Sequence, residues 1–136
     1  MVLFDRGNGG AIPNNGIVVV GNHPEVLEAL VDLIGEEPGL HVIAATRDGM
    51  EAIALAGIHR PVVLLVDMEA TDISAALIAR DVHLLNPSIR LVALSHYDDA
   101  ASVRRSLDAG FDRHVSKYSG IADLLTILLE DHVCIA

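Results

Sequence analysis

The sequence predicts a doubly wound α/β domain in which a five-stranded parallel sheet is covered by helices on both faces. Three observations support this prediction. Short apolar runs alternate with helical patterns five times along the chain. The length of 136 residues is that of a single domain. Hydrophobic residues make up 51% of the chain, yet it has only two Phe, two Tyr and no Trp, so its core must consist of Val, Ile, Leu and Ala, as in buried parallel strands.

The first part of the chain predicts a leader, a strand and a helix. Residues 1–16 are rich in Gly, Asn and Pro without hydrophobic periodicity, which favours a flexible leader. The β-branched run at 17–20 is typical of a strand buried on both faces. Pro24 suits the first position of a helix, and apolar residues then recur at helical spacing until Pro38 and the following glycine end the pattern.

The second and third units repeat this order of strand and helix. Strands are predicted at 41–45 and 62–66, with a helical stretch at 50–56 between them. The run at 62–66 is the most apolar in the chain, and it ends at Asp67. Helical signals resume at 74–85 and stop at an Asn-Pro-Ser sequence.

The fourth and fifth units complete the domain. The expected elements are a strand at 91–94, a helix at 98–109, a short strand at 112–115 and a helix at 121–128. Gly110 follows the first of these helices, as in a glycine C-cap. The domain is expected to span residues 17–131, followed by a short tail at 132–136.

Three polar residues lie where predicted strands end. Asp67 follows the third strand, Ser95 the fourth and Lys117 the fifth. Because the carboxyl ends of parallel strands line the ligand crevice of such sheets, these side chains are expected to converge. A carboxylate, a small hydroxyl and an ammonium are the groups needed to bind or accept a phosphoryl group. Lys117 is the only lysine in the chain, so its position at a strand end is poorly explained by chance.

Four stretches in this order, at residues 23–26, 60–67, 91–95 and 108–111, resemble the receiver domain of two-component response regulators, most closely the receivers of LuxR-type DNA-binding regulators. The likeness runs from about residue 17 to residue 130. It implies a flavodoxin-like (β/α)5 receiver fold. It also implies that Asp67 is the phosphoacceptor, that Ser95 hydrogen-bonds a phosphoryl oxygen and that Lys117 pairs with the phosphoryl charge.

The chain departs from this family at the metal site. Family members usually carry two adjacent acidic residues after the first strand, which hold Mg²⁺ together with the acceptor aspartate. Gly21 and Asn22 occupy these positions here. Mg²⁺ prefers carboxylate oxygens and water in octahedral geometry. The remaining candidate ligands are Asp67, Asn22 and Glu69, and we therefore expect a Mg²⁺ site that is weak or absent.

The resemblance also places a switch pair at Ser95 and His114. His114 stands where ordinary receivers carry an aromatic side chain that swings inward, and its imidazole is polar. With few carboxylates at the site, Lys117 is able to pair directly with Asp67, which would make the ion pair permanent. Coupling to an output is therefore expected to differ from that of an ordinary receiver.

The sequence predicts an atypical receiver domain that acts as a signalling or interaction module in two-component transcriptional regulation, rather than as an enzyme. Phosphorylation at Asp67 is expected to be weak or absent. The expected partners are a histidine kinase or another signalling protein, a DNA-binding output domain in cis or in trans, and a second copy of the chain in a homodimer. One alternative is a conventional receiver that a histidine kinase phosphorylates on Asp67. A flavodoxin-like cofactor enzyme is a further alternative, based on the fold only.

Composition and motifs argue against several other classes. A net charge of −10, from nine basic and nineteen acidic residues, disfavours direct binding to nucleic acid. No apolar run approaches the roughly 20 residues that span a bilayer, and no signal peptide is visible. The single Cys134 permits no internal disulfide, which favours a cytoplasmic setting. His23, His96 and His114 lack the tight spacing of a zinc motif.

Overall fold

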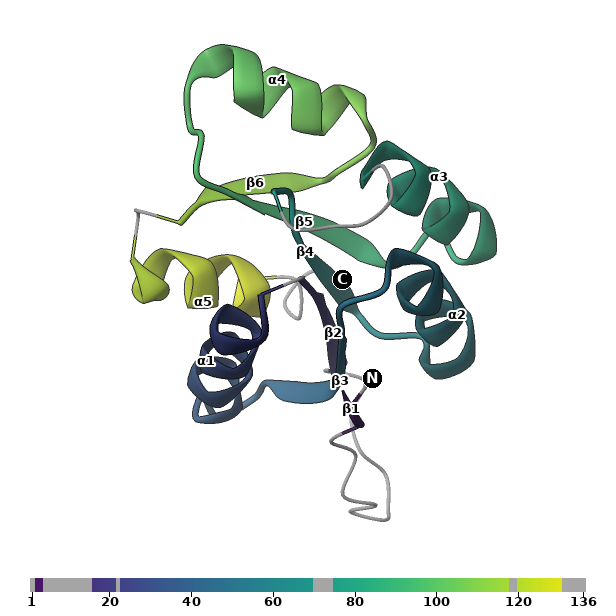
Figure 1. Cartoon of the computed structure of the whole chain (residues 1–136), viewed down its shortest axis with the longest axis vertical. Coiled ribbons are helices and arrows are strands. Elements are labelled where there is room, and N and C mark those ends of the chain that lie inside the picture. Colours follow the sequence, from purple (N-terminus) through teal and green to yellow (C-terminus); the bar gives the residue numbers. More distant parts are fainter. Residues whose placement is uncertain (1, 4–15, 22, 70–74, 118–119, 131–136) are drawn as a thin grey trace.

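The computed structural model describes residues 2–3, 16–21, 23–69, 75–117 and 120–130. Within these residues, six strands form one sheet in the order β1-β3-β2-β4-β5-β6. The strands are β1 (Val2–Leu3), β2 (Gly16–Val20), β3 (His41–Thr46), β4 (Val63–Asp67), β5 (Arg90–Ser95) and β6 (Arg113–Ser116). The helices are α1 (Pro24–Gly35), α2 (Gly49–His59), α3 (Ala75–Leu85), α4 (Ala100–Asp108) and α5 (Ile121–Glu130). The five predicted parallel strands and five helices are confirmed (Figure 1).

The sheet has one strand that was not predicted. β1 pairs with β3 in the antiparallel direction, with Val2 opposite Ala45 and Leu3 opposite Ala44. The prediction of a flexible leader over residues 1–16 is wrong for this strand and for Gly16, which begins β2. A two-residue strand has no periodicity to detect, and it depends on the exposed edge that β3 offers after the domain has folded. Residues 4–15 of the predicted leader lie outside the described residues.

The helices form two layers on the sheet. α1 and α5 cover one face, and α2, α3 and α4 cover the other (Figure 1). Described residues form one apolar cluster beneath each layer, with Ile17, Leu65 and Leu128 on the α1–α5 side and Leu64, Ile78 and Phe111 on the opposite side. Successive residues of β2 and β4 therefore point into different clusters, and both strands are buried along their whole length.

Acidic side chains cap two of the helices at their N-termini. At the start of α2, Asp48 Oδ1 accepts hydrogen bonds from the backbone N–H groups of Met50, at 2.9 Å, and of Glu51, at 3.4 Å. The Asp99 carboxylate accepts from the backbone N–H of Ser102 at 3.2 Å and from Ser102 Oγ at 2.8 Å, at the start of α4. These hydrogen bonds lower the pKa of Asp99, the side-chain bond from Ser102 having the largest effect. Both caps fix where a helix leaves the edge of the sheet that carries the polar site.

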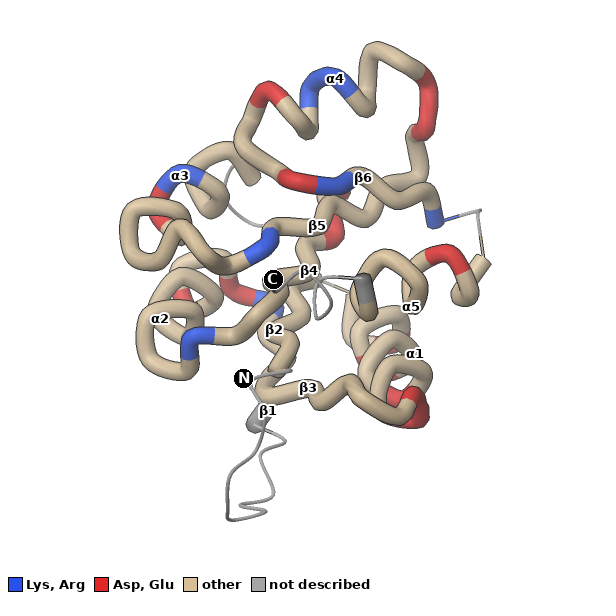
Figure 2. The backbone as a smooth tube through the Cα atoms, turned by 180° about the vertical axis from the view of Figure 1, so that it is seen from behind, with Lys and Arg blue, Asp and Glu red and all other residues tan. Residues whose placement is uncertain are grey.

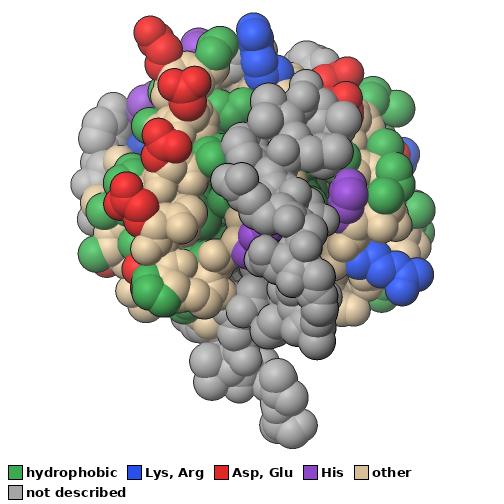
Figure 3. Space-filling view, turned by 90° about the horizontal axis from the view of Figure 1, so that it is seen from below, with side chains coloured by type: hydrophobic (Ala, Val, Ile, Leu, Met, Phe, Trp, Pro, Cys, Tyr) green, Lys and Arg blue, Asp and Glu red, His purple; other side chains and the backbone are tan. Residues whose placement is uncertain are grey.

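Charge is distributed unevenly over the surface. Basic residues of the described chain are scattered over several elements (Figure 2). Acidic side chains gather on α1, as the space-filling view from below shows (Figure 3). Exposed residues of this acidic row are Glu25, Glu28, Asp32 and Glu36. Among the helices that the structure describes, none is long and apolar enough to cross a membrane.

Candidate functional site

The site lies at the carboxyl edge of the central strands. The chain passes from β2 outward to β3 and then back to β4 on the other side of β2, so the direction of winding reverses between β2 and β4. Ligands of such sheets bind outside the strand ends at this point. Asp67 is the last residue of β4, and its side chain is only 3% exposed. Ser95 ends the neighbouring strand β5 and is also buried.

Backbone hydrogen bonds beyond the strand ends bring Lys117 to Asp67. The Lys117 N–H donates to the Ser95 carbonyl at 2.7 Å, and the Met68 N–H donates to the Leu94 carbonyl at 2.9 Å. These bonds extend the pairing of β4 and β6 with β5 by one residue beyond the ends of β4 and β6. Lys117 Nζ then lies 2.8 Å from Asp67 Oδ1. The predicted convergence of Asp67, Ser95 and Lys117 is therefore present in the structure.

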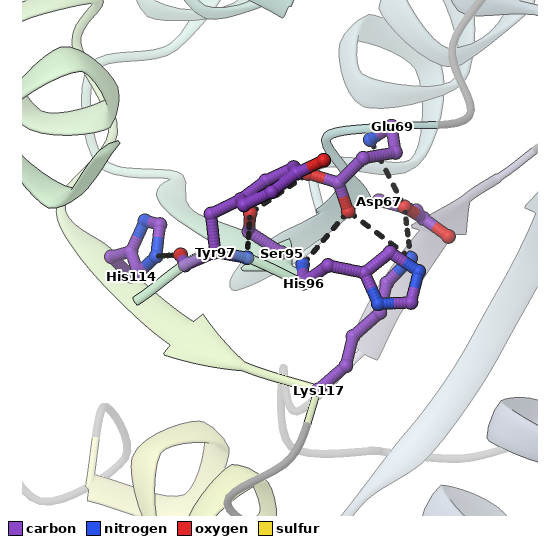
Figure 4. A network of polar contacts seen from close by, with 7 residues as sticks. All are labelled: Asp67, Glu69, Ser95, His96, Tyr97, His114 and Lys117. Atoms are coloured by element: carbon purple, nitrogen blue, oxygen red, sulfur yellow. Dashed lines mark hydrogen bonds and ion pairs between the residues drawn. The ribbon is translucent and has the colours of Figure 1, made fainter. Parts of the chain in front are cut away.

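Glu69 is the centre of the polar network (Figure 4). Its Oε2 accepts a hydrogen bond from Ser95 Oγ at 2.8 Å, and its Oε1 accepts from the His96 backbone N–H at 2.9 Å. Lys117 Nζ lies 3.3 Å from the same Oε1. The Glu69 N–H donates to Asp67 Oδ1 at 3.2 Å, which fixes the start of the turn. The Glu69 carboxylate therefore meets three donors from two segments, residues 95–96 and Lys117.

The electrostatic environment keeps Glu69 ionised. Burial alone would raise the pKa of its carboxyl group. The hydrogen bonds from the His96 N–H, Ser95 Oγ and Lys117, together with the charge of Lys117, outweigh burial and lower the pKa below its ordinary value of 4.5. Glu69 is therefore a carboxylate at neutral pH, hydrogen-bonded to one charged and two neutral donors.

A second set of contacts connects the site to α4. Ser95 Oγ accepts a hydrogen bond from the Tyr97 N–H at 3.0 Å. His114 Nε2 donates to the Tyr97 carbonyl at 2.7 Å, and His114 Nδ1 lies 2.7 Å from Ser106 Oγ on α4. His114 therefore bridges the segment after β5 and the buried face of α4. A continuous polar path leads from Asp67 through Glu69 and Ser95 to this helix.

The donor set does not fit a magnesium ion well. Gly21 offers no side chain, and its N–H donates to the Thr46 carbonyl at 3.0 Å. The Lys117 ammonium lies between the Asp67 and Glu69 carboxylates, where a bound cation would have to lie. In the described part of the chain, no group of three or more His, Cys, Asp or Glu residues is arranged to hold a metal ion. Asn22, a predicted weak ligand, lies outside the described residues.

Position 21 nevertheless has room for a side chain. A Cβ atom there would lie 3.5 Å from Asp67 Cβ and 3.7 Å from Leu27 Cδ1, which are ordinary van der Waals distances. Its distance to Asp67 Oδ2 would be 3.9 Å. A side chain at position 21, directly after β2, would therefore start close to the Asp67 carboxylate, and glycine leaves this space without a side chain.

Sequence reasoning missed three participants in the network, the His96 N–H, the Tyr97 backbone and Ser106, and assigned a fourth, Glu69, differently. The His96 N–H is a backbone donor and carries no sequence signal. Ser106 did leave a signal, because Ser102 and Ser106 stand four residues apart in the sequence, which places them on one face of a helix. In the structure both are buried on α4. Glu69 was considered only as a metal ligand, whereas its carboxylate binds Ser95, His96 and Lys117.

Comparison with known proteins gives one consistent result. The sequence model of the response regulator receiver domain family matches residues 17–129. The transcriptional regulatory protein DegU of Brevibacillus brevis is 27% identical over 74% of this chain and 43% of its own length. The DNA-binding transcriptional activator DevR/DosR of Mycobacterium tuberculosis is 29% identical over 74% of this chain and 46% of its own length.

A solved structure agrees with the sequence matches. The crystal structure of a two-component response regulator of the LuxR family from Aurantimonas sp. superposes with a TM-score of 0.76 at 25% identity, covering 85% of each chain. The chain spans about half the length of the curated relatives that it matches. The likeness to those relatives therefore concerns a receiver-sized part of them.

Proposed function

The chain belongs to the response regulator receiver domain family, and on this premise we propose that it is an atypical receiver with weak or no Mg²⁺-dependent phosphorylation at Asp67. In this proposal the domain works as a signalling and interaction module of a two-component system that controls transcription. The alternative is a conventional receiver that a histidine kinase phosphorylates on Asp67. Retention of Asp67, Ser95 and Lys117 supports the alternative. The replacement of the usual acidic pair by Gly21 and Asn22 supports the proposal.

One observation supports the proposal above the others. The Lys117 ammonium lies within 2.8 Å of Asp67 and 3.3 Å of Glu69, while Gly21 contributes no carboxylate to the edge of β2. Phosphoryl transfer depends on positioning and on neutralising charge, largely through a metal ion. Here a fixed ammonium balances the local negative charge instead. Such a site has little attraction left for a divalent cation.

The residues present still allow a slow reaction. An Asp67 carboxylate oxygen would attack the phosphorus atom of a donor, forming an acyl phosphate while the bond from phosphorus to the leaving group breaks. Lys117 would pair with the phosphoryl charge, and Ser95 Oγ would donate to a phosphoryl oxygen. Mg²⁺, when bound, would neutralise charge on the transferring group. Without strong metal ligands this catalysis is expected to be weak.

The proposed partners follow from the family and the surface. DegU and DevR/DosR are transcriptional regulators by name and are about twice as long as the match, so we propose a DNA-binding output domain in cis or in trans. A histidine kinase or another signalling protein would be the upstream partner. For a homodimer we propose the apolar groove between α1 and α5, where Val26, Leu33 and Ile121 are partly exposed beside the acidic row.

The test is the intact mass of the protein after incubation with a small phosphodonor, with and without Mg²⁺. Asp67→Ala is the control for the modified position. The proposal expects no adduct, or a slow and weakly metal-dependent one. A rapid Mg²⁺-dependent adduct that disappears in Asp67→Ala would establish the conventional receiver instead.

A further inference from the structure

The three donors around Glu69 form a site for a small oxyanion. The Ser95 hydroxyl lies at the end of β5, the His96 N–H directly follows it, and the Lys117 ammonium belongs to the residue directly after β6. All three point at the two oxygens of one carboxylate, at distances of 2.8, 2.9 and 3.3 Å (Figure 4). One cationic donor, one hydroxyl and one backbone N–H are a typical set for binding a phosphate or carboxylate group.

The occupant of this site is part of the chain. Glu69 follows Asp67 by two residues, and its N–H donates to Asp67 Oδ1, so the backbone keeps its carboxylate next to the acceptor. A ligand tethered at such short range has a high effective concentration and competes strongly with a dissolved ion. The Glu69 carboxylate also engages the same Ser95 and Lys117 groups that are assigned to a phosphoryl group in the proposed function.

We propose that Glu69 is a built-in ligand that occupies the phosphoryl site, holds Ser95 in its anion-bound arrangement without covalent modification, and must leave before an external oxyanion can bind. The inference rests on the proposed function only for the identity of that oxyanion, a phosphate or phosphoryl group. In the proposed function the missing metal ligands limit phosphorylation of Asp67, and the occupation of the site by Glu69 is a second cause.

The rest of the network shows what this occupation controls. Ser95 Oγ donates to Glu69 and accepts from the Tyr97 N–H, so the position of the hydroxyl is set from both sides. The Tyr97 carbonyl accepts from His114, whose second nitrogen contacts Ser106 on α4. If another anion displaced Glu69, a change in the position of Ser95 would reach α4 through the hydrogen bonds of Tyr97 and His114.

The test uses inorganic phosphate as the probe, at constant ionic strength and without Mg²⁺ or a phosphodonor. Binding is followed by NMR through the backbone amide of His96 and the side chain of Lys117, which gives a single signal after selective lysine labelling because it is the only lysine. Glu69→Ala is compared with the wild type. Phosphate can bind only those molecules in which Glu69 has left the site, so a small empty fraction lowers the apparent affinity of the wild type. Glu69→Ala is therefore expected to bind phosphate at least about tenfold more tightly than the wild type.

Controls keep the result decisive. Glu28→Ala removes the same charge from an exposed position on α1 and should leave phosphate binding unchanged. Glu69→Gln keeps the shape of the side chain and should also bind phosphate more tightly than the wild type, which covers the case that Glu69→Ala does not fold. Equal phosphate affinity in the wild type and the folded Glu69 variants, or no binding in those variants, would overturn the inference. The mass measurement decides separately whether Asp67 is phosphorylated, so the failure of this inference can be told from the failure of the proposed function.

Discussion

Lys117 Nζ lies 2.8 Å from Asp67 Oδ1 in a site where the Asp67 side chain is only 3% and the Lys117 side chain 16% exposed. The ion pair is therefore largely withdrawn from water, and its geometry is set by backbone pairing at the ends of β5 and β6. Removing one partner of such a pair leaves the other charge without compensation. The same ammonium also compensates Glu69, so its loss affects two carboxylates at once.

We expect Lys117→Met to destabilise the domain by about 3 kcal/mol at neutral pH, because Asp67 and Glu69 would then repel each other without a cation between them. The measurement is the free energy of unfolding from urea titration. Arg104→Met removes one positive charge from an exposed position on α4 and should change this free energy by less than about 0.5 kcal/mol.

The double variant Asp67→Asn, Lys117→Met tests the pair itself. Neutralising Asp67 should recover part of the stability lost in Lys117→Met, so the two substitutions should be clearly non-additive. Additive losses would mean that the contact between Lys117 and Asp67 contributes little and that Lys117 acts through Glu69 alone.

A carboxylate at position 21 should create metal binding. The distances from a Cβ at Gly21 to Asp67 and Leu27 leave room for Gly21→Asp without a clash. Its carboxylate would add a hard oxygen ligand beside Asp67, as Mg²⁺ prefers. We expect Mg²⁺ to raise the melting temperature of Gly21→Asp but not of the wild type, because a ligand that binds only the folded state stabilises it.

Asp67 should be phosphorylated faster by a small phosphodonor in Gly21→Asp than in the wild type. Metal ions supply several kcal/mol of charge stabilisation in phosphoryl transfer, so Mg²⁺-dependent labelling of Asp67 should increase about tenfold or more. Gly35→Asp, at an open position at the end of α1, is the matched control for the added charge. If Gly21→Asp gained neither thermal stabilisation nor labelling, the missing carboxylate would not be what limits metal binding.

The sequence was sufficient to predict how Asp67, Ser95 and Lys117 come together, because parallel strands separated by helices place all their carboxyl ends at one edge. Periodicity and helix-breaking residues also located the helices. The exact ends were less predictable, as in α2, which extends to His59 instead of residue 56. Its last turn is exposed and apolar at Ile58, so burial alone could not define where it stops.

The state of the site was not predictable in the same way. Whether Glu69 turns toward a metal position or toward Ser95 depends on side-chain torsions after β4, and hydrophobic patterning carries no information about them. The role of the His96 N–H depends on backbone direction alone. The pairing of β1 with β3 likewise involves only two residues and exists only once β3 is in place.

The stability of the domain should depend on pH through Glu69. The folded-state pKa of Glu69 lies below its ordinary value of 4.5, so its ionised form stabilises the folded protein. Because the pKa is lowered on folding, the ionised carboxylate contributes to the free energy of unfolding fully above about pH 4.5. This contribution is lost as the pH falls through the folded-state pKa. Glu69→Gln removes this titration. The difference in unfolding free energy between wild type and Glu69→Gln should therefore be largest near neutral pH and shrink on acidification.

Urea titrations at a series of pH values measure this difference. Glu28→Gln, at an exposed position on α1, should remain within about 0.5 kcal/mol of the wild type throughout. A difference between wild type and Glu69→Gln that is constant over the acid range would show that the charge of Glu69 does not stabilise the fold.

His114 should hold α4 to the segment that follows β5. Its ring bonds the Tyr97 carbonyl and Ser106 Oγ, both at 2.7 Å, and Ser106 lies on the buried face of α4. His114→Phe keeps an aromatic ring of similar size but cannot form either bond. Since each hydrogen bond contributes about 1 kcal/mol, we expect a loss of about 1–2 kcal/mol, and faster amide hydrogen exchange concentrated in α4 and around Tyr97.

His59→Phe is the control. His59 is half-buried at the end of α2, which covers the same face of the sheet as α4 but lies far from the His114 contacts in sequence. His59→Phe should leave hydrogen exchange in α4 unchanged. If His114→Phe accelerated exchange evenly over the whole domain, His114 would act as a general packing residue. Acceleration limited to α4 and Tyr97 would instead identify the ring as the physical connection between the Glu69 site and this helix, since the Tyr97 N–H is in turn bound to Ser95 Oγ.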